Sequence, residues 1–213
     1  KGIGALTFSF IDADQAREHV EHYHRTLADE GVAIGPSVNP NIAVVTGMMC
    51  DHDEQRAIDR GIDGVHYFAY SIAHYAVFGD HRPGRTNLYE EFEQRRDAMG
   101  MSRAPIVADG RPLTVRQSSP EEAAIEDAGG LERGSLSSLR GAIGTPEQIR
   151  EFLRGYEEAG VDQMIFHGQA GTMRHEHICE SLELFAKEVM PEFKERDAQR
   201  TAEKERRLAP VVE

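Results

Sequence analysis

The sequence contains no tryptophan and only two cysteines, Cys50 and Cys179, among its 213 residues. The two cysteines lie far apart and form no CxxC pair, so no disulfide framework is indicated. This usage fits a reducing compartment, and we expect a cytoplasmic protein. No apolar run approaches the roughly 18 residues that a membrane-spanning helix requires, so no membrane span is expected.

Positive charge is also scarce. The chain has 24 Lys and Arg against 37 Asp and Glu, which gives a formal net charge of -13. Such a chain repels phosphate backbones and anionic lipid, so we expect neither a nucleic acid nor a membrane as partner. Hydrophobic residues make up 39% of the chain and charged residues 29%, which is the composition of a globular protein.

Three apolar segments are predicted to be neighbouring parallel strands, in chain order. They are apolar without clean alternation, which is typical of strands covered on both faces. They are Gly2–Phe8, Ile42–Met48 and Val161–Phe166, and a shorter strand is predicted at Arg140–Gly144. Because Gly2 opens a core strand with no lead-in, we expect the chain to be part of a longer protein.

Helix signals lie between these strands. Asp12 with Gln15, and Thr145-Pro146 with Gln148, are capping boxes that predict helices ending near Asp29 and at Gly160. Further helices are predicted at 53–60, 87–99 and 175–189. Strand–helix alternation of this kind indicates crossover units and an α/β fold with a parallel sheet.

Residues 61–140 interrupt this alternation. Their aromatic part, 65–78, is predicted to be helical and mostly buried, and the acidic, glycine-rich part, 118–134, to be a surface loop. At the carboxyl end, 194–207 reads as a charged helical extension or a frayed tail.

The carboxyl-terminal motifs carry a family resemblance. The relevant segments are Gly144–Ile149, Tyr156–Phe166, Gln169–Gly171, His175–Cys179 and Ser181–Phe193. In this order and spacing they resemble the seventh helix, eighth strand and eighth helix of bacterial luciferase-like flavin-dependent monooxygenases. Gly2–Phe10 is similar to the family's sixth strand, and Ile42–Asp53 is similar to its seventh.

The resemblance implies the second half of a TIM-type (β/α)8 barrel, with a long insertion between the seventh strand and the seventh helix. Residues 1–193 would form this partial barrel domain, with the insertion at about 61–140, and residues 194–213 would be a charged extension. A complete barrel takes about 250 residues. We therefore expect either a missing amino-terminal half or a dimer partner, and this chain alone to be inactive.

The resemblance also implies a reaction. Reduced FMN would transfer one oxygen atom from O2 to a small organic substrate, with NADH or NADPH reducing the flavin directly or through a flavin reductase. Two alternatives stay open: a deazaflavin-dependent oxidoreductase of the same fold, and a non-catalytic flavin-binding subunit.

Barrel enzymes place their sites at the carboxyl ends of strands, so the predicted flavin contacts are the residues that follow the first and last strands: Thr7, Phe8, Gly168 and Gln169. Catalytic residues are not identified by the sequence, although His52 and His175 occupy suitable places. Phe8 can equally be core, and both histidines can simply stand at helix starts.

Tyr67 and His74, in the aromatic segment, are the predicted substrate contacts, although aromatic residues at helical spacing also form core. A second group, His19, His22 and His24, does not converge on one helical face. We interpret it as surface histidines and expect no metal site.

Overall fold

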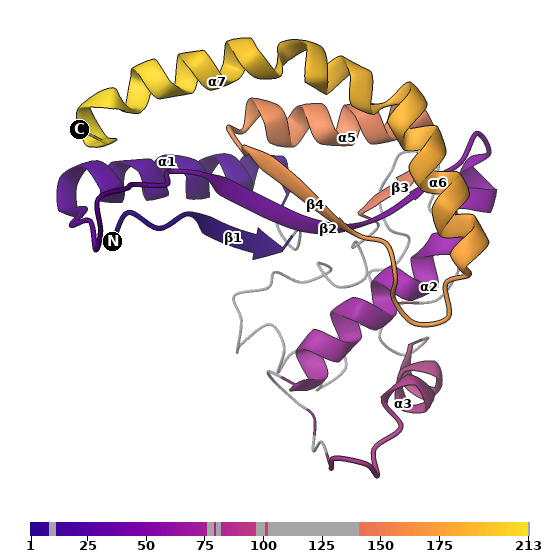
Figure 1. Ribbon diagram of the computed structural model, residues 1–213. Coiled ribbons are helices and arrows are strands. Elements are labelled where there is room, and N and C mark those ends of the chain that lie inside the picture. Colours follow the sequence, from indigo (N-terminus) through magenta and orange to yellow (C-terminus); the bar gives the residue numbers. More distant parts are fainter. Residues whose placement is uncertain (9–11, 76–78, 80–81, 97–100, 102–140, 213) are drawn as a thin grey trace.

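The computed structural model describes residues 1–8, 12–75, 79, 82–96, 101 and 141–212. The predicted surface loop at 118–134 lies outside the described residues, as does most of the predicted insertion. In chain order the elements are β1 (Ala5–Phe8), α1 (Ala13–Glu30), β2 (Ile42–Cys50), α2 (Glu54–Ala73), α3 (Leu88–Arg95), β3 (Ala142–Gly144), α5 (Pro146–Glu158), β4 (Gln163–His167), α6 (His175–Glu188) and α7 (Met190–Val212) (Figure 1).

The described strands form a parallel sheet around β2. Its partner β1 runs from the Ala5–Ile42 pair to Phe8–Val45, and β4 runs from Ala43–Gln163 to Gly47–His167. Since β1 and β4 pair with the same stretch of β2, they occupy its opposite edges. The predicted order of three neighbouring parallel strands is therefore confirmed. The fourth strand, β3, pairs with the last three residues of β2.

The sheet is open in the part of the chain that the structure describes, and the fold is mixed α/β with six described helices. It has the parallel strands and covering helices expected of a barrel wall, but a half barrel is not established by four strands. None of the described helices is both long and apolar enough to cross a lipid bilayer.

The two faces of the sheet are covered differently. Ile42, Val44, Met48 and Cys50 of β2 pack against α1, α5 and the α6–α7 region. The alternating residues Gly47 and Met49 face α2 instead. Figure 1 shows α1 and α5 on one side of the sheet, with α7 lying outside α5, and α2 crossing the other side. We call the second side the α2 face. The register places on it Leu6, Phe8, Ala43, Val45, Gly47, Met49, Gln163, Ile165 and His167.

Both predicted capping boxes are present. Asp12 Oδ1 accepts the backbone N–H of Gln15 at 2.8 Å, and the Thr145 hydroxyl oxygen accepts that of Gln148 at 3.4 Å. Each side chain satisfies an N–H group that the first helical turn leaves without a partner. Helices α1 and α5, which begin at these caps, pack together over the outer face of the sheet, which is the face opposite the α2 face.

Helix α2 corrects the predicted boundary at residue 60. The expected short helix at 53–60 and the aromatic segment after it form one helix of 20 residues, with Asp53 as its N-cap. Gly61 and Gly64 read as interruptions because glycine weakens a helix interior. Their role is close packing: a Cβ at Gly61 would lie 2.5 Å from Met49 Cβ, and one at Gly64 would lie 2.3 Å from Met173 Sδ.

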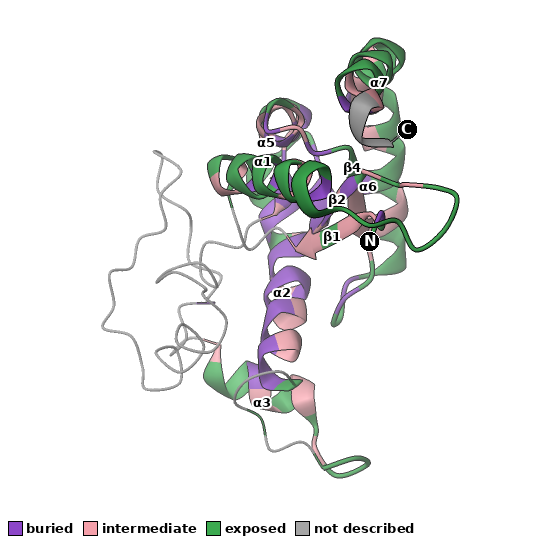
Figure 2. Ribbon diagram, turned by 90° about the vertical axis from the view of Figure 1, so that its left-hand side faces the viewer, coloured by how far each residue is buried: buried purple, intermediate pink, exposed green. Residues whose placement is uncertain are grey.

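The charged carboxyl-terminal segment is helical, as α7, and is ion-paired to the main body. Arg154 of α5 meets Glu192 at 2.7 Å, and Arg196 meets Glu157 at 2.8 Å. Farther along, Lys204 Nζ lies 2.7 Å from Asp162 Oδ1. The other oxygen of Asp162 accepts the backbone N–H of Ile42, the first residue of β2, at 2.7 Å. Ion pairs therefore hold α7 to the main body near its start and again at Lys204, although most of its residues are exposed (Figure 2).

We predict that Gly61→Ala lowers the free energy of unfolding. Alanine favours a helix over glycine by about 1 kcal/mol, but here its methyl group would overlap Met49 Cβ, and overpacking a core costs about 1–3 kcal/mol. Gly155→Ala in α5 is the matched control, because among the described residues its added Cβ would contact only Ala13 Cβ, at 3.2 Å. Urea denaturation of both variants gives the comparison. Equal or greater stability of Gly61→Ala than of Gly155→Ala would contradict the close-packing role.

Candidate functional site

Two groups of side chains gather where the parallel strands end. One follows β2 and lies between α2 and α6. The other lies on the α2 face, at the ends of β1 and β4. Polar and aromatic residues at this edge of a parallel sheet are the natural candidates for a site, because the loops that follow the strands converge there.

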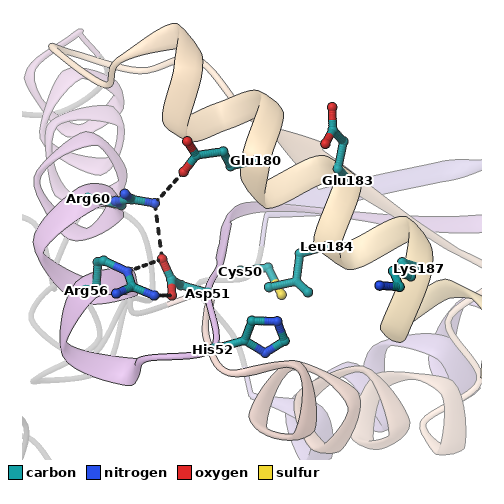
Figure 3. A pocket seen from close by; sticks show the side chains of 9 residues that line it. All are labelled: Cys50, Asp51, His52, Arg56, Arg60, Glu180, Glu183, Leu184 and Lys187. Carbon is teal, nitrogen blue, oxygen red and sulfur yellow. Dashed lines mark hydrogen bonds and ion pairs between the residues drawn. The ribbon is translucent and has the colours of Figure 1, made fainter.

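The first group is an ion-pair network around Asp51, which is 5% exposed. Its carboxylate accepts hydrogen bonds from Arg56 Nε at 2.8 Å, Arg60 Nη1 at 3.1 Å and the Asp53 backbone N–H at 3.0 Å. Arg60 continues to Glu180 of α6 at 2.8 Å (Figure 3). The hydrogen bond from Arg56 is the main cause that lowers the pKa of Asp51. The network ties the end of β2 to two helices.

A pocket of about 420 Å³ lies beside this network, between α2 and α6. It is lined by Cys50, Asp51, His52, Arg56, Arg60, Glu180, Glu183, Leu184 and Lys187 (Figure 3). Burial raises the pKa of Cys50 to about 12, so its thiol stays protonated and unreactive. The backbone N–H of Cys50 donates to the Ser181 hydroxyl at 2.7 Å, which holds α6 against β2.

The second group is aromatic. The ring of His167, the last residue of β4, stacks on Phe68 of α2 with centroids 4.1 Å apart and planes at 27°. Phe68 in turn lies 5.8 Å from Phe8 at the end of β1. Burial lowers the pKa of His167, so its ring is neutral near pH 7. Its Nδ1 is enclosed and has no hydrogen-bond partner among the described residues.

The structure does not bring all four predicted flavin contacts together. Phe8 belongs to the aromatic group on the α2 face, whereas Thr7 alternates with it and pairs with Val44 on the opposite, helix-covered face. Gly168 and Gln169 begin the loop after β4, at the same edge as Phe8. The Gln169 side chain is exposed and its Nε2 donates to the Met173 carbonyl at 3.3 Å, within its own loop.

The predicted substrate contacts both pack between α2 and α3. Tyr67 lies edge-on to Tyr89 at 5.1 Å and to Phe92 at 5.6 Å. His74 is 2% exposed, with Nδ1 3.5 Å from Glu91 Oε2. In the structure these two side chains contribute to helix packing, which is the alternative that the aromatic spacing left open.

The two predicted catalytic histidines lie at opposite ends of α6. His175 is its first residue, with Nε2 3.5 Å from Cys179 Sγ, whereas His52 Nε2 lies 3.7 Å from Oε1 of Glu188, its last residue. A helix of 14 residues is roughly 20 Å long. The structure therefore does not bring His52 and His175 into one site.

The histidines of α1 make separate contacts. His24 Nε2 lies 3.3 Å from the Pro40 carbonyl, and His22 Nδ1 lies 3.4 Å from Arg25 Nη2. Within the described ranges, no three His, Cys, Asp or Glu side chains converge in a way that could hold a metal ion.

Comparison with known proteins does not assign the chain to a family. No known family profile matches the chain, and no curated protein is significantly similar to it in sequence. Among solved structures, a monooxygenase from Streptomyces bottropensis matches with a TM-score of 0.46 and 13% sequence identity. That match covers 90% of this chain and 42% of the monooxygenase, so the chain spans less than half of that protein's length.

We predict that Asp51→Asn destabilises the fold by about 2 kcal/mol or more, because it leaves Arg60 and Arg56 without their buried carboxylate. Since the folded-state pKa of Asp51 lies below its ordinary value, its contribution is present above the unfolded pKa of about 3.9 and is lost as pH falls through the folded pKa. The stability difference between wild type and Asp51→Asn should shrink accordingly in acid.

Asp59→Asn is the control for this substitution, because Asp59 is exposed on the same helix and, within the described part of the chain, accepts a hydrogen bond only from Gln55, at 3.0 Å. Denaturant unfolding between pH 3 and pH 7 measures both variants. A loss at Asp51 no larger than at Asp59 would show that the network does not hold α2 and α6 to β2.

Proposed function

We propose that this chain is the carboxyl-terminal part of a flavin-dependent monooxygenase of the bacterial luciferase type, using FMN. The observation that carries the proposal is the arrangement of the three strands that resemble the family's sixth, seventh and eighth. These strands, β1, β2 and β4, are parallel and adjacent in that order, with α1 and α5 on one face. A barrel wall has this arrangement.

The α2 face has features that suit a flavin. A flavin ring is planar and mostly apolar, with polar atoms along one edge. Phe8 and Phe68 offer aromatic surface, and the ring of His167 stacks on Phe68 beside them. Of the residues named from the sequence, we propose that Phe8 lies against the ring and that Gly168 and Gln169 approach it from the loop after β4. Thr7 faces the helical layer and would contribute little.

When bound, FMN would supply the oxygen chemistry, and the chain would supply the surroundings. Phe8, Phe68 and the apolar side chains of Val45 and Ile165 would exclude water from one side of the ring. Exclusion of water protects a reactive flavin from side reactions. Gly168, which lacks a side chain, would let the loop backbone approach a ligand closely. The small organic substrate would enter over the same strand ends.

We also propose that other strands complete the wall. Leu6 on the α2 face is 58% exposed, and Ala43, Val45 and Ile165 are only partly covered. A strand edge and an apolar face of this kind recruit a partner. That partner would be an amino-terminal half of the same protein or a second subunit.

The runner-up function is a deazaflavin-dependent oxidoreductase of the same fold, because the aromatic wall would suit either ring. A flavin-binding subunit without catalysis is the alternative outside enzymes. Titration with FMN and with a deazaflavin, for the chain with and without the residues upstream of it, followed by NADH- or NADPH-dependent oxygen uptake with and without a flavin reductase, separates the three. Oxygen uptake that requires FMN, and that the deazaflavin does not support, favours the monooxygenase.

We predict that, in the complete enzyme, Gln169→Ala weakens FMN binding several-fold, since one polar contact contributes about 1 kcal/mol, while the melting temperature stays unchanged. Its side chain is exposed and bonds only to the nearby Met173 carbonyl. Gln55→Ala on the outer side of α2 is the control, as Gln55 is also exposed and makes one side-chain contact, with Asp59. Flavin fluorescence quenching gives the affinities, and equal values for Gln169→Ala and wild type would remove Gln169 from the site.

We further predict that the 213-residue chain on its own self-associates or binds the dye ANS strongly, because burying apolar surface is worth roughly 25 cal/mol per Å². Leu6→Ser should reduce both signals. Leu182→Ser is the matched control, since Leu182 is 47% exposed on α6, away from the open face. Light scattering and ANS fluorescence test this; a compact, non-binding monomer would show that the α2 face needs no partner.

A further inference from the structure

The loop that joins β4 to α6, residues 168–174, lies against both α2 and α3 (Figure 1). Its first two residues, Gly168 and Gln169, are the proposed flavin contacts. We propose that Tyr89 of α3 is a positioning residue for these contacts, because its hydroxyl bonds to Thr172 and holds the loop in the conformation that meets a flavin ring. The inference rests on the function proposed above, and it adds a residue that touches the loop rather than the ligand.

The loop has a buried side and an exposed side. Ala170 and Met173 are each 8% exposed and belong to the core under α2. The backbone N–H of Met173 donates to the Ala170 carbonyl at 3.3 Å, which closes the turn between them. A Cβ at Gly64 of α2 would lie 2.9 Å from that carbonyl oxygen, so the helix and the loop are in close contact. Gln169 is exposed, so a ligand can reach it without displacing this core.

The tip of the loop lies against two tyrosine rings. Gly171 has a φ of +55°, and a Cβ there would lie 3.3 Å from Tyr67 Cδ1 and 3.4 Å from Tyr89 Cε2. Glycine permits both this backbone conformation and the close approach. Next to it, the hydroxyl oxygens of Tyr89 and Thr172 lie 3.2 Å apart, and either can be the donor. This hydrogen bond joins α3 to the loop.

Packing against α2 fixes the place of Tyr89. Phe92 of α3 is fully buried and shares a core cluster with Ala69 and Tyr70 of α2, and Tyr89 packs against the same cluster. The hydroxyl of Tyr89 is therefore a rigid point to which the loop tip can bond. The sequence does not single out Tyr89 or Thr172, because the two meet only in the folded chain.

A second anchor on the loop bears on ligand binding. With Ala170 and Met173 held under α2 and Thr172 held by α3, the loop has few conformations open to it before a ligand arrives. Such preorganisation lowers the entropy lost on binding. When the loop tip can leave α3, only a fraction of the molecules presents Gln169 correctly, and the apparent affinity falls by that fraction.

The test uses the complete protein, with FMN as the probe. Tyr89→Phe keeps the ring against Gly171 and removes only the hydroxyl. We expect FMN binding about two- to fivefold weaker, the effect of losing one hydrogen bond. Amide hydrogen exchange in residues 168–173 should be faster, and the melting temperature close to that of wild type. Tyr67→Phe is the matched control, because the described residues offer its hydroxyl no hydrogen-bond partner, and it should bind FMN as wild type does.

Variants of Thr172 separate this bond from a general loosening of the loop. Thr172→Val keeps the shape of the side chain and removes its hydroxyl, so it should match Tyr89→Phe. The double variant should bind FMN no more weakly than either single variant, because the same bond is lost in all three. Thr172→Ser keeps a hydroxyl and should retain the affinity and the exchange rates of wild type.

Several outcomes would overturn the positioning role while leaving the proposed function intact. They are an unchanged FMN affinity in Tyr89→Phe, an equal loss in Tyr67→Phe, additive losses in the double variant, and unchanged hydrogen exchange in the loop. If the wild-type protein binds neither FMN nor a deazaflavin, the proposed function fails, and the positioning role fails with it.

Discussion

The described sheet and the helices that cover it depend on the central strand β2, because both of its edges are paired and both of its faces are packed. Its hydrogen bonds set the register of β1, β3 and β4. Its outward side chains define the core shared by α1, α5 and α6, and Met49 defines the core under α2. Since a shift of one residue would exchange the two faces, the positions of Asp51 and of Gly47 follow from the same register.

The two faces of β2 are covered to different extents. On the outer side, the ion pairs Arg154–Glu192, Glu157–Arg196 and Asp162–Lys204 link α5 and the sheet to α7, and the Ser181 hydroxyl accepts the backbone N–H of Cys50. Helices therefore cover that side of the sheet. On the α2 face, α2 covers only the carboxyl ends of the strands, and Leu6 with the half-buried Val45 stays accessible. A ligand or further strands can add to this face without displacing a helix.

Local signals explain what the sequence predicts well. The capping boxes at Asp12 and Thr145 and the apolar strands are read from neighbouring residues alone, and they are observed. The two helical segments predicted within α2 are observed, and only the break between them is wrong: Gly61 and Gly64 weaken a helix locally, but they pack closely against Met49 and Met173 from across the fold. The same limit applies to the site: the stacking of Phe68 on His167 joins residues about a hundred positions apart along the chain, and no short motif records it.

Asp51 and His167, one in each of the two groups at the strand ends, differ in how far the fold satisfies their polar atoms. Asp51 is a charge that the fold has satisfied with two guanidinium groups and a backbone N–H, so a new ligand there would have to break ion pairs. His167 is uncharged, held on one flat side and short of a partner at Nδ1. Because binding favours sites where the free protein has least to lose, we propose the α2 face rather than the Asp51 pocket as the ligand site of this chain.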